Sequence, residues 1–339
     1  MGGRRIALAA AALAAVSATA AWAAAPGPGT SSGTGRVFFP NPVAQLHNEG
    51  LTDQKDADYA ALQPAYKTVT LTDLDGSGFL RGRWANVVSE TGNPAYSPTN
   101  TFSYNRSQDE FEQVMAYYWV TQAQLYIQRL GFGSTRRPVN AESQDIRINQ
   151  WGADNSFWTN HPKDEIRFGK GGVDDAEDAE VILHEYGHAI QDSQVTCFGS
   201  SPEGGAIGEA FGDYWAVTVT DTVAHNGFDV PCVADWDSVS YTSGPSHCLR
   251  RVDAKKHYPE DVVGEVHADG EIWSRALWDI RNALGSIQAD TIILESQFSF
   301  APDTTFAQAA AVTVATAQKI CGTKAAKAVT TAFANRGIL

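Results

Sequence analysis

The chain has 339 residues, of which 43% are hydrophobic, and its formal net charge is −14. This hydrophobic content is typical of a globular protein and excludes a largely disordered chain. No basic patch is visible, and phosphate binding depends on clustered lysines and arginines, so we expect no nucleic-acid partner.

The amino terminus has the pattern of a secretory signal peptide. Arg4 and Arg5 precede an apolar run at residues 6–16, and Ala21-Trp22-Ala23 fits an A-x-A cleavage site. We therefore predict a signal peptide at residues 1–23 and a secreted, extracellular protein. The alternative, a membrane anchor, is disfavoured because the run is short and alanine-rich. No later apolar segment reaches the length of a membrane span.

The first part of the mature chain is predicted to be rich in strands. Residues 24–36 are mostly Pro, Gly, Ser and Thr, which indicates a flexible leader. Residues 37–172 then hold short β-prone runs, such as 67–71 and 83–88. They also contain one stretch in which apolar residues recur at helical spacing, and this stretch ends at Gly131. We expect an N-terminal β-rich lobe that contains one long helix.

The most informative stretch is His184-Glu185-Tyr186-Gly187-His188. Histidines four residues apart on a helix lie on the same face, so both rings can bind one metal ion. Glu209 follows 21 positions after His188, and Asp213 comes one helical turn later. Two histidines and a glutamate leave the fourth position of a zinc ion open, which is typical of catalytic zinc. The spacing therefore predicts one catalytic Zn²⁺.

Residues 173–339 are predicted to form a zinc-binding helical catalytic lobe. The acidic segment 174–180 precedes the zinc helix, where carboxylates favour the helix dipole, so it requires no bound ion. Further helical patterns end at glycines 285, 322 and 337. The whole is an α+β arrangement, with a strand-rich N-terminal lobe, a mainly helical C-terminal lobe and the zinc helix at the cleft between them.

The four cysteines form an even set, which suits an oxidising compartment. They allow three pairings. We favour Cys232 with Cys248 because this pair closes a short loop, and this leaves Cys197 with Cys321.

Several motifs resemble those of the thermolysin-like zinc metallopeptidases (gluzincins), with fungalysin as a related branch. H-E-x-x-H is followed by Gly208-Glu209-Ala210-Phe211-Gly212-Asp213, similar to the G-E-x-x-x-D of that family. Three more segments are similar and fall in the same order: Asn155-Ser156-Phe157-Trp158, Leu249-Arg250 and Val266-His267. The resemblance covers roughly residues 107–339.

The resemblance implies a role for each matching residue at the zinc site. His184, His188 and Glu209 would be the zinc ligands, and Glu185 would be the general base. Zinc lowers the pKa of its bound water to about 7, so a nearby carboxylate can take the proton as the water attacks a peptide carbonyl. Asp213 would accept a hydrogen bond from His184 and fix its tautomer.

Other matching residues would act on the substrate. His267 would donate a hydrogen bond to the oxyanion of the transition state. Arg250 would bind a substrate carbonyl, with Arg251 as the alternative if the register differs by one. Asn155 and the backbone of Ser156 would align an extended peptide as an added strand.

The sequence also departs from the family pattern. Ser200 stands where thermolysin has a tyrosine that donates to the oxyanion, and Val262 replaces an acid that would orient the catalytic histidine. Asp261 is then the expected partner of His267. The usual large propeptide is missing. Glu180 matches a calcium-binding acid of the family and could bind Ca²⁺ together with Asp221.

These features predict a secreted zinc endopeptidase that cleaves peptides or proteins on the amino side of apolar residues and acts as a monomer. One alternative is a non-catalytic zinc-binding or adhesion module, which the absent tyrosine and propeptide would favour. A zinc aminopeptidase is disfavoured, because that class needs a Gly-x-Met-Glu-Asn motif and neither Met1 nor Met115 lies in one.

Overall fold

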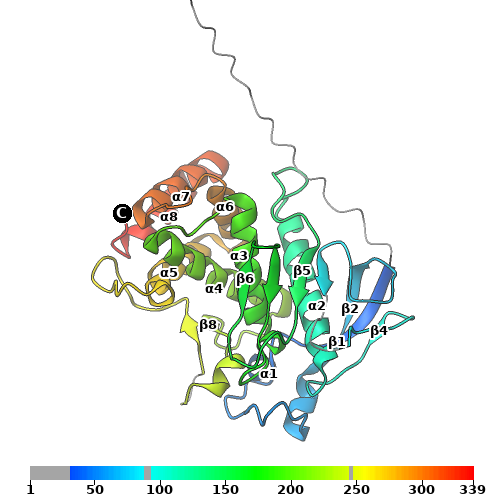
Figure 1. Cartoon of the computed structure of the whole chain (residues 1–339). Coiled ribbons are helices and arrows are strands. Elements are labelled where there is room, and N and C mark those ends of the chain that lie inside the picture. The colour runs from blue at the N-terminus through cyan, green and yellow to red at the C-terminus, as the bar shows by residue number, and fades with distance from the viewer. Residues whose placement is uncertain (1–30, 88–92, 244–246) are drawn as a thin grey trace, which may run out of the picture.

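The computed structural model describes residues 31–87, 93–243 and 247–339 (Figure 1). The strands are β1 Ser31–Phe38, β2 Tyr66–Leu74, β3 Ala85–Val87, β4 Thr101–Phe102, β5 Gln144–Arg147, β6 Phe157–Thr159, β7 Glu165–Arg167, β8 Cys232–Val233 and β9 Arg250–Arg251. The α-helices are α1 Pro42–Leu46, α2 Asp109–Arg129, α3 Ala179–Gln194, α4 Pro202–Ala224, α5 Val266–Leu284, α6 Ser286–Gln297, α7 Phe306–Cys321 and α8 Thr323–Ala334. Three 3₁₀ turns complete the elements: η1 Ala60–Ala65, η2 Asp175–Glu177 and η3 Asp237–Ser240.

The longer strands precede the helical region, as expected. One sheet has the order β2-β1-β4 and another the order β3-β5-β7-β6, in which β3, β5 and β7 are parallel and β6 is an antiparallel edge strand. In Figure 1 these sheets and α2 lie on one side, helices α5 to α8 lie on the other, and α3 and α4 run between them. The α+β prediction of two lobes with the metal-motif helix between them is confirmed.

Helix α2 is the centre of the strand-bearing side. Its residues from Phe111 to Thr121 are buried without interruption, which is expected when a helix is covered on all faces. Nε1 of Trp119 donates to the carbonyl of Phe38 at 3.3 Å, so β1 is fixed to this helix. The same hydrophobic core continues into α3, α4 and α5, and this joins the two halves of the molecule.

The prediction of a leader through residue 36 is wrong for its second part. Residues 31–36 belong to β1, which pairs with β2 over its length and with β4 in parallel. Small residues suit this strand because its neighbours approach closely: a Cβ on Gly33 would lie 2.2 Å from the carbonyl oxygen of Asn100. The Gly/Ser/Thr composition reflects close packing here. The predicted signal peptide and residues 24–30 lie outside the described residues.

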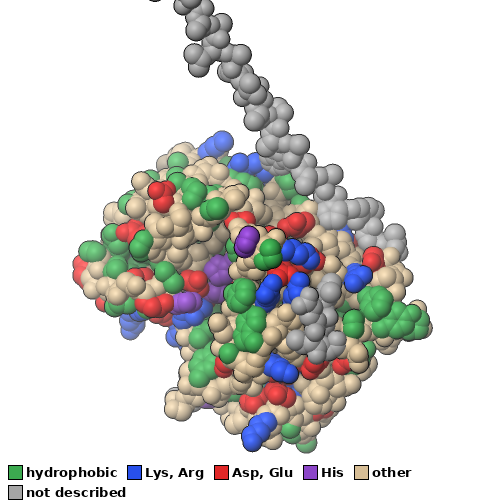
Figure 2. All heavy atoms as spheres, in the orientation of Figure 1, with side chains coloured by type: hydrophobic (Ala, Val, Ile, Leu, Met, Phe, Trp, Pro, Cys, Tyr) green, Lys and Arg blue, Asp and Glu red, His purple; other side chains and the backbone are tan. Residues whose placement is uncertain are grey.

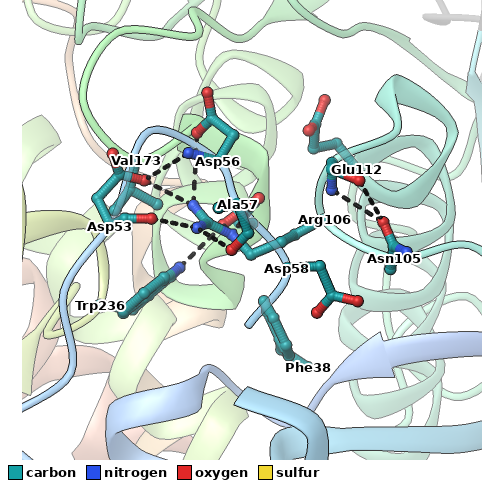
Figure 3. Close-up of polar contacts among 12 residues, drawn as sticks. Phe38, Asp53, Asp56, Ala57, Asp58, Asn105, Arg106, Glu112, Val173 and Trp236 are labelled. Carbon is teal, nitrogen blue, oxygen red and sulfur yellow. Dashed lines mark hydrogen bonds and ion pairs between the residues drawn. The ribbon is translucent and has the colours of Figure 1, made fainter. Parts of the chain in front are cut away.

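A buried arginine connects the strand-bearing side to the segment that leads into α3. Arg106 has a fully buried side chain and lies 2.9 Å from Glu177 and 2.7 Å from Asp53. Figure 3 shows its guanidinium between Asp53 and Asp56, with the ring of Trp236 nearby. Nε1 of Trp236 donates to Glu177 at 3.0 Å. The charge of Glu177 is therefore balanced by a charged group and an indole N–H.

One of the two predicted disulfides is present. Cys232 and Cys248 are bonded, as expected from the short loop between them. The pairing of Cys197 with Cys321 is wrong, since both are free cysteines: Cys197 lies in the turn after α3, Cys321 lies at the end of α7, and the fold does not join them. Among the described residues, no helix has both the length and the apolarity needed to cross a membrane.

Candidate active site

Helix α3 presents His184, Glu185 and His188. The helix begins after Asp178, whose side chain accepts from the amide of Glu180 at 2.9 Å, an N-cap of the usual kind. The two histidine rings lie with their centroids 5.0 Å apart and nearly perpendicular. His184 and Glu185 are 8% and 6% exposed, so the motif lines the floor of a recess rather than the surface.

Helix α4 brings Glu209 to these histidines because two glycines let the helices approach. A Cβ on Gly187 would lie 2.9 Å from the Cα of Gly212, and a Cβ on Gly212 would lie 2.7 Å from the ring of His184. Any larger residue at either position would push α3 and α4 apart. The glycines of both motifs are therefore a geometric requirement for placing Glu209.

The three candidate ligands converge. Nε2 of His184 lies 3.2 Å from Oε2 of Glu209, and Nε2 of His188 lies 3.7 Å from Oε1 of Glu209. One donor atom from each of the three residues lies within 4.8 Å of the others. Oε2 of Glu209 is buried and has no hydrogen-bond donor that meets the usual geometry. A His₂Glu donor set with a buried, unsatisfied carboxylate oxygen fits a tetrahedral metal ion.

Asp213 lies behind His184 and is held by Arg250. Oδ1 of Asp213 is 2.8 Å from Nδ1 of His184, the geometry in which a carboxylate fixes the tautomer of a ligand histidine. Burial disfavours the charged form of Asp213, but the guanidinium of Arg250 and the ring of His184 hold its pKa at about 2. Burial also lowers the pKa of His184, yet Asp213 and Glu209 raise it to about 10. A metal ion at Nε2 would replace that proton.

His267 is in the first turn of α5 and faces Glu209. Its Nε2 lies 3.2 Å from Oε2 of Glu209, and its Nδ1 lies 2.6 Å from Oε1 of Glu265, the residue that also caps α5. The expectation that Asp261 would orient this histidine is wrong, because Asp261 accepts from the amide of His257 instead. In the sequence, Glu265 stands two residues before His267 at the start of a predicted helix. This spacing could have indicated that Glu265 is the partner of His267, and the sequence prediction missed it.

A single cleft of about 930 Å³ contains most of these side chains. Its lining includes His184, Glu185, His188, Glu209, His267 and Arg250. Asn155 and Ser156, which precede edge strand β6, and Phe157 and Trp158, which belong to it, also line the cleft. Figure 2 shows histidine side chains in a hollow of the face drawn there. Of the two arginines considered for substrate binding, Arg250 lines the cleft. Arg251 instead pairs with Asp229 and Asp253.

Residues 199–338 match the family model described as the thermolysin metallopeptidase, alpha-helical domain. The helical lobe of this chain therefore resembles the corresponding domain of thermolysin-like metallopeptidases. The precursor of protealysin, a metalloproteinase from Serratia proteamaculans, has a solved structure with a TM-score of 0.60 and 17% sequence identity, over 76% of this chain and 86% of that one. This likeness concerns the fold. Curated protein sequences gave no match.

The two predicted calcium residues lie in different surroundings. Glu180 accepts from the amide of Ala234 at 2.7 Å and from the hydroxyl of Thr220 at 3.0 Å. Asp221 forms an ion pair with Arg281. Burial, together with Asp178 and Asp235, raises the pKa of Glu180 well above its ordinary value. Calcium at Glu180 and Asp221 stays a prediction.

The acidic segment 174–180, which we expected to be explained by the dipole of the following helix, lies mostly before α3 and is buried. Five of its seven residues are acids, all of them buried: Asp174, Asp175, Glu177, Asp178 and Glu180. Only Asp178 and Glu180 belong to the start of α3. The helix dipole therefore explains part of this segment, and the remaining acids need other partners.

Proposed function

We propose that this chain is a secreted zinc endopeptidase in which His184, His188 and Glu209 hold one catalytic Zn²⁺. The observation that carries the proposal is the convergence of these three donor groups in a cleft that also contains Glu185 and an edge strand. The donor set supports zinc, because imidazole and carboxylate ligands with one open position are those of catalytic zinc enzymes. Zinc bound there would supply an activated water and polarise the substrate carbonyl.

Glu185 acts as the general base of this mechanism. It follows His184 on α3 and lines the same cleft while remaining 6% exposed. A carboxylate there takes the proton from the attacking water and then delivers it to the leaving amine. A site kept only for metal binding would have no need of this acid, so its presence favours an enzyme over a non-catalytic zinc module.

His267 stabilises the oxyanion. With Nδ1 held by Glu265, its Nε2 is turned toward the metal-binding carboxylate of Glu209, where the scissile carbonyl would lie. Hydrogen-bond donors aimed at developing negative charge are among the largest contributions to rate. Arg250, which lines the same cleft, binds a substrate carbonyl.

The substrate is an extended peptide that adds to β6. This strand is an edge of its sheet, so one row of its backbone groups is available for pairing. Asn155 and the backbone of Ser156 fix the register at the start of β6. An extended substrate bound in this way supports cleavage inside a chain rather than removal of a terminal residue.

The test is hydrolysis of casein and of an internally quenched apolar peptide by the purified mature protein. We expect activity that 1,10-phenanthroline abolishes and added zinc restores. Glu185→Gln should retain stoichiometric zinc and lose hydrolysis, whereas Glu260→Gln, at an exposed position, should retain both. A zinc-loaded, folded wild type that cleaves neither substrate would favour the non-catalytic module. Hydrolysis by the Glu185→Gln variant would remove this residue from the mechanism.

We also propose export and a monomeric state. The disulfide between Cys232 and Cys248 supports an oxidising compartment, since such bonds are rare in reducing ones. Expression of the whole chain with its first 23 residues should yield extracellular protein that begins near Ala24. Light scattering on that product should give the mass of one chain.

A further inference from the structure

A second group of acids lies in the cleft, apart from the candidate zinc ligands. Asp154 precedes β6, Asp175 begins η2, and Asp237 begins η3. One carboxylate oxygen from each lies within 4.8 Å of the other two. All three residues line the cleft, with Asp154 exposed at its mouth and Asp175 and Asp237 only 2% and 4% exposed.

The two buried acids each have one oxygen without a partner. The hydroxyl of Ser156 donates to Oδ2 of Asp175, and the hydroxyl of Tyr241 donates to Oδ2 of Asp237 at 2.7 Å. Oδ1 of Asp175 and Oδ1 of Asp237 are buried and accept no hydrogen bond. Leaving a buried carboxylate oxygen unsatisfied costs free energy, so these atoms indicate a missing ligand.

Two neighbouring acids of the same region, Glu177 and Asp178, have several hydrogen-bond or charge partners. Glu177 has Arg106 and the indole of Trp236. Asp178 accepts from three backbone amides, those of Glu180, Trp236 and Asp237. Among the ion pairs of the described residues, none includes Asp154, Asp175 or Asp237. A bound cation would supply the positive charge that the described residues do not provide to the ionised group.

We propose that Asp154, Asp175 and Asp237 bind a calcium ion at the wall of the active-site cleft. Oxygen atoms within 4.8 Å of one another need at most small side-chain shifts to reach one ion at the Ca²⁺–O distance of about 2.3–2.6 Å. An all-carboxylate set favours hard cations over zinc. Calcium accepts six to eight oxygens in flexible geometry, and the open side of the cleft leaves room for water ligands, whereas Mg²⁺ demands a near-ideal octahedron.

The ion would connect three segments that meet at the cleft. Asp154 lies just before Asn155 and Ser156, Asp175 lies just before α3, and η3 with Asp237 precedes β9, which carries Arg250. Burial raises the pKa of Asp175 and Asp237, so without a cation their ionisation opposes this arrangement. A bound calcium would therefore stabilise the substrate strand against the metal-motif helix.

The experiment is a calcium titration of protein that has been stripped of metal and reloaded with one equivalent of zinc. At pH 8 we expect the Tm to rise by about 5 °C at a calcium concentration 100-fold above Kd. Terbium should bind at the same site, with luminescence sensitised through Tyr241. The variants Asp237→Asn and Asp154→Asn should lose both responses; Asp154 is exposed, so its replacement should not impair folding.

Glu180→Gln and Asp221→Asn alter the acids of the other predicted calcium site, so they show which of the two sites produces the response. Both should retain the calcium-dependent rise in Tm and the terbium signal. The proposal is overturned if calcium leaves the Tm of the wild type unchanged, if the Asp154→Asn and Asp237→Asn variants respond like the wild type, or if Glu180→Gln alone abolishes the response. Melting and luminescence need no hydrolysis, so this result is independent of the peptidase assay.

Discussion

Arg250 holds both carboxylate oxygens of Asp213, with Nε at 2.7 Å from Oδ2 and Nη2 at 2.8 Å from Oδ1. The same Oδ1 lies 2.8 Å from Nδ1 of His184. Arg250 also lines the cleft. One arginine can therefore act on the substrate and, through Asp213, on the orientation of a candidate metal ligand.

The first prediction concerns Asp213. Asp213→Asn keeps the shape of the side chain but removes the charge that holds His184, and we expect zinc affinity to fall about 10–100-fold. Competition with a chromophoric chelator measures this change. Asp279→Asn, which removes a surface partner of Arg275, should leave zinc affinity unchanged. Wild-type zinc affinity in Asp213→Asn would mean that Asp213 does not position His184.

Replacing Arg250 separates its two roles. If Arg250 binds a substrate carbonyl, Arg250→Met should lower kcat/KM about 10-fold or more, mainly through KM, because a charged hydrogen bond is lost. Zinc affinity should fall less than in Asp213→Asn. Arg251→Met is the neighbouring control and should leave KM unchanged, since Arg251 pairs with Asp229 and Asp253. A normal KM combined with a large loss of zinc affinity would restrict Arg250 to positioning.

His267→Ala should lower kcat about 100–1000-fold with little change in zinc content, as expected for loss of an oxyanion donor. Glu265→Gln should lower kcat by a smaller factor, since the ring would keep its donor at Nε2 and only the charge of its partner at Nδ1 would be lost. Steady-state kinetics with a quenched peptide, together with metal analysis, measure both effects. His257→Ala, an exposed histidine of the preceding loop, should behave like the wild type. Full activity in His267→Ala would exclude this role.

The ion pair of Arg106 should be important for stability. Arg106→Met leaves Glu177 buried without its charged partner, and we expect the free energy of unfolding to fall by about 3–5 kcal/mol. Urea denaturation measures the change. Lys163→Met removes an exposed partner of Asp145 and should cost less than about 1 kcal/mol. Equal effects of the two substitutions would mean that Arg106 does not balance a buried charge.

The acids of the proposed calcium site should make metal-free stability depend on pH. Burial raises the pKa of Asp175 to about 8 and that of Asp237 well above its ordinary value. Because the folded protein binds these protons more tightly, their stabilising contribution is complete below about pH 4 and is lost as the pH rises through 8. Groups that face the pair from the surrounding elements are Asp154, Asp174, Asp178, Glu185, Ser156 and Tyr241.

Urea unfolding in chelator at pH 5 and pH 8 tests this dependence. From pH 5 to pH 8 the free energy of unfolding of the wild type should decrease. The decrease for Asp237→Asn should be smaller by at least about 1 kcal/mol. Calcium should have the opposite pH dependence, with its stabilising effect growing as the pH rises, because it binds the ionised acids. An identical decrease in variant and wild type would place the titrating groups elsewhere.

Local spacing was sufficient to predict the metal motif. His184 and His188 are four residues apart on one helix, as are Glu209 and Asp213, so their relative positions follow from helix geometry alone. The resemblance implied that an extended peptide would pair beside Asn155 and Ser156, and β6, which follows them, is an edge strand. In contrast, Asp261 and Glu265 are both plausible partners of His267 in the sequence, and only the way α5 begins selects Glu265.

The spacing of residue types in the sequence was therefore sufficient to predict the donor groups of the candidate metal site and the α+β class. Tertiary structure decided whatever depends on segments far apart in the chain: the approach of α3 to α4 through Gly187 and Gly212, the pairing of residues 31–36 into β1, and the burial of the acids before α3. Burial is set by what packs against a residue. A carboxylate that would be solvated at a free helix start is buried inside the cleft wall, and burial raises its pKa.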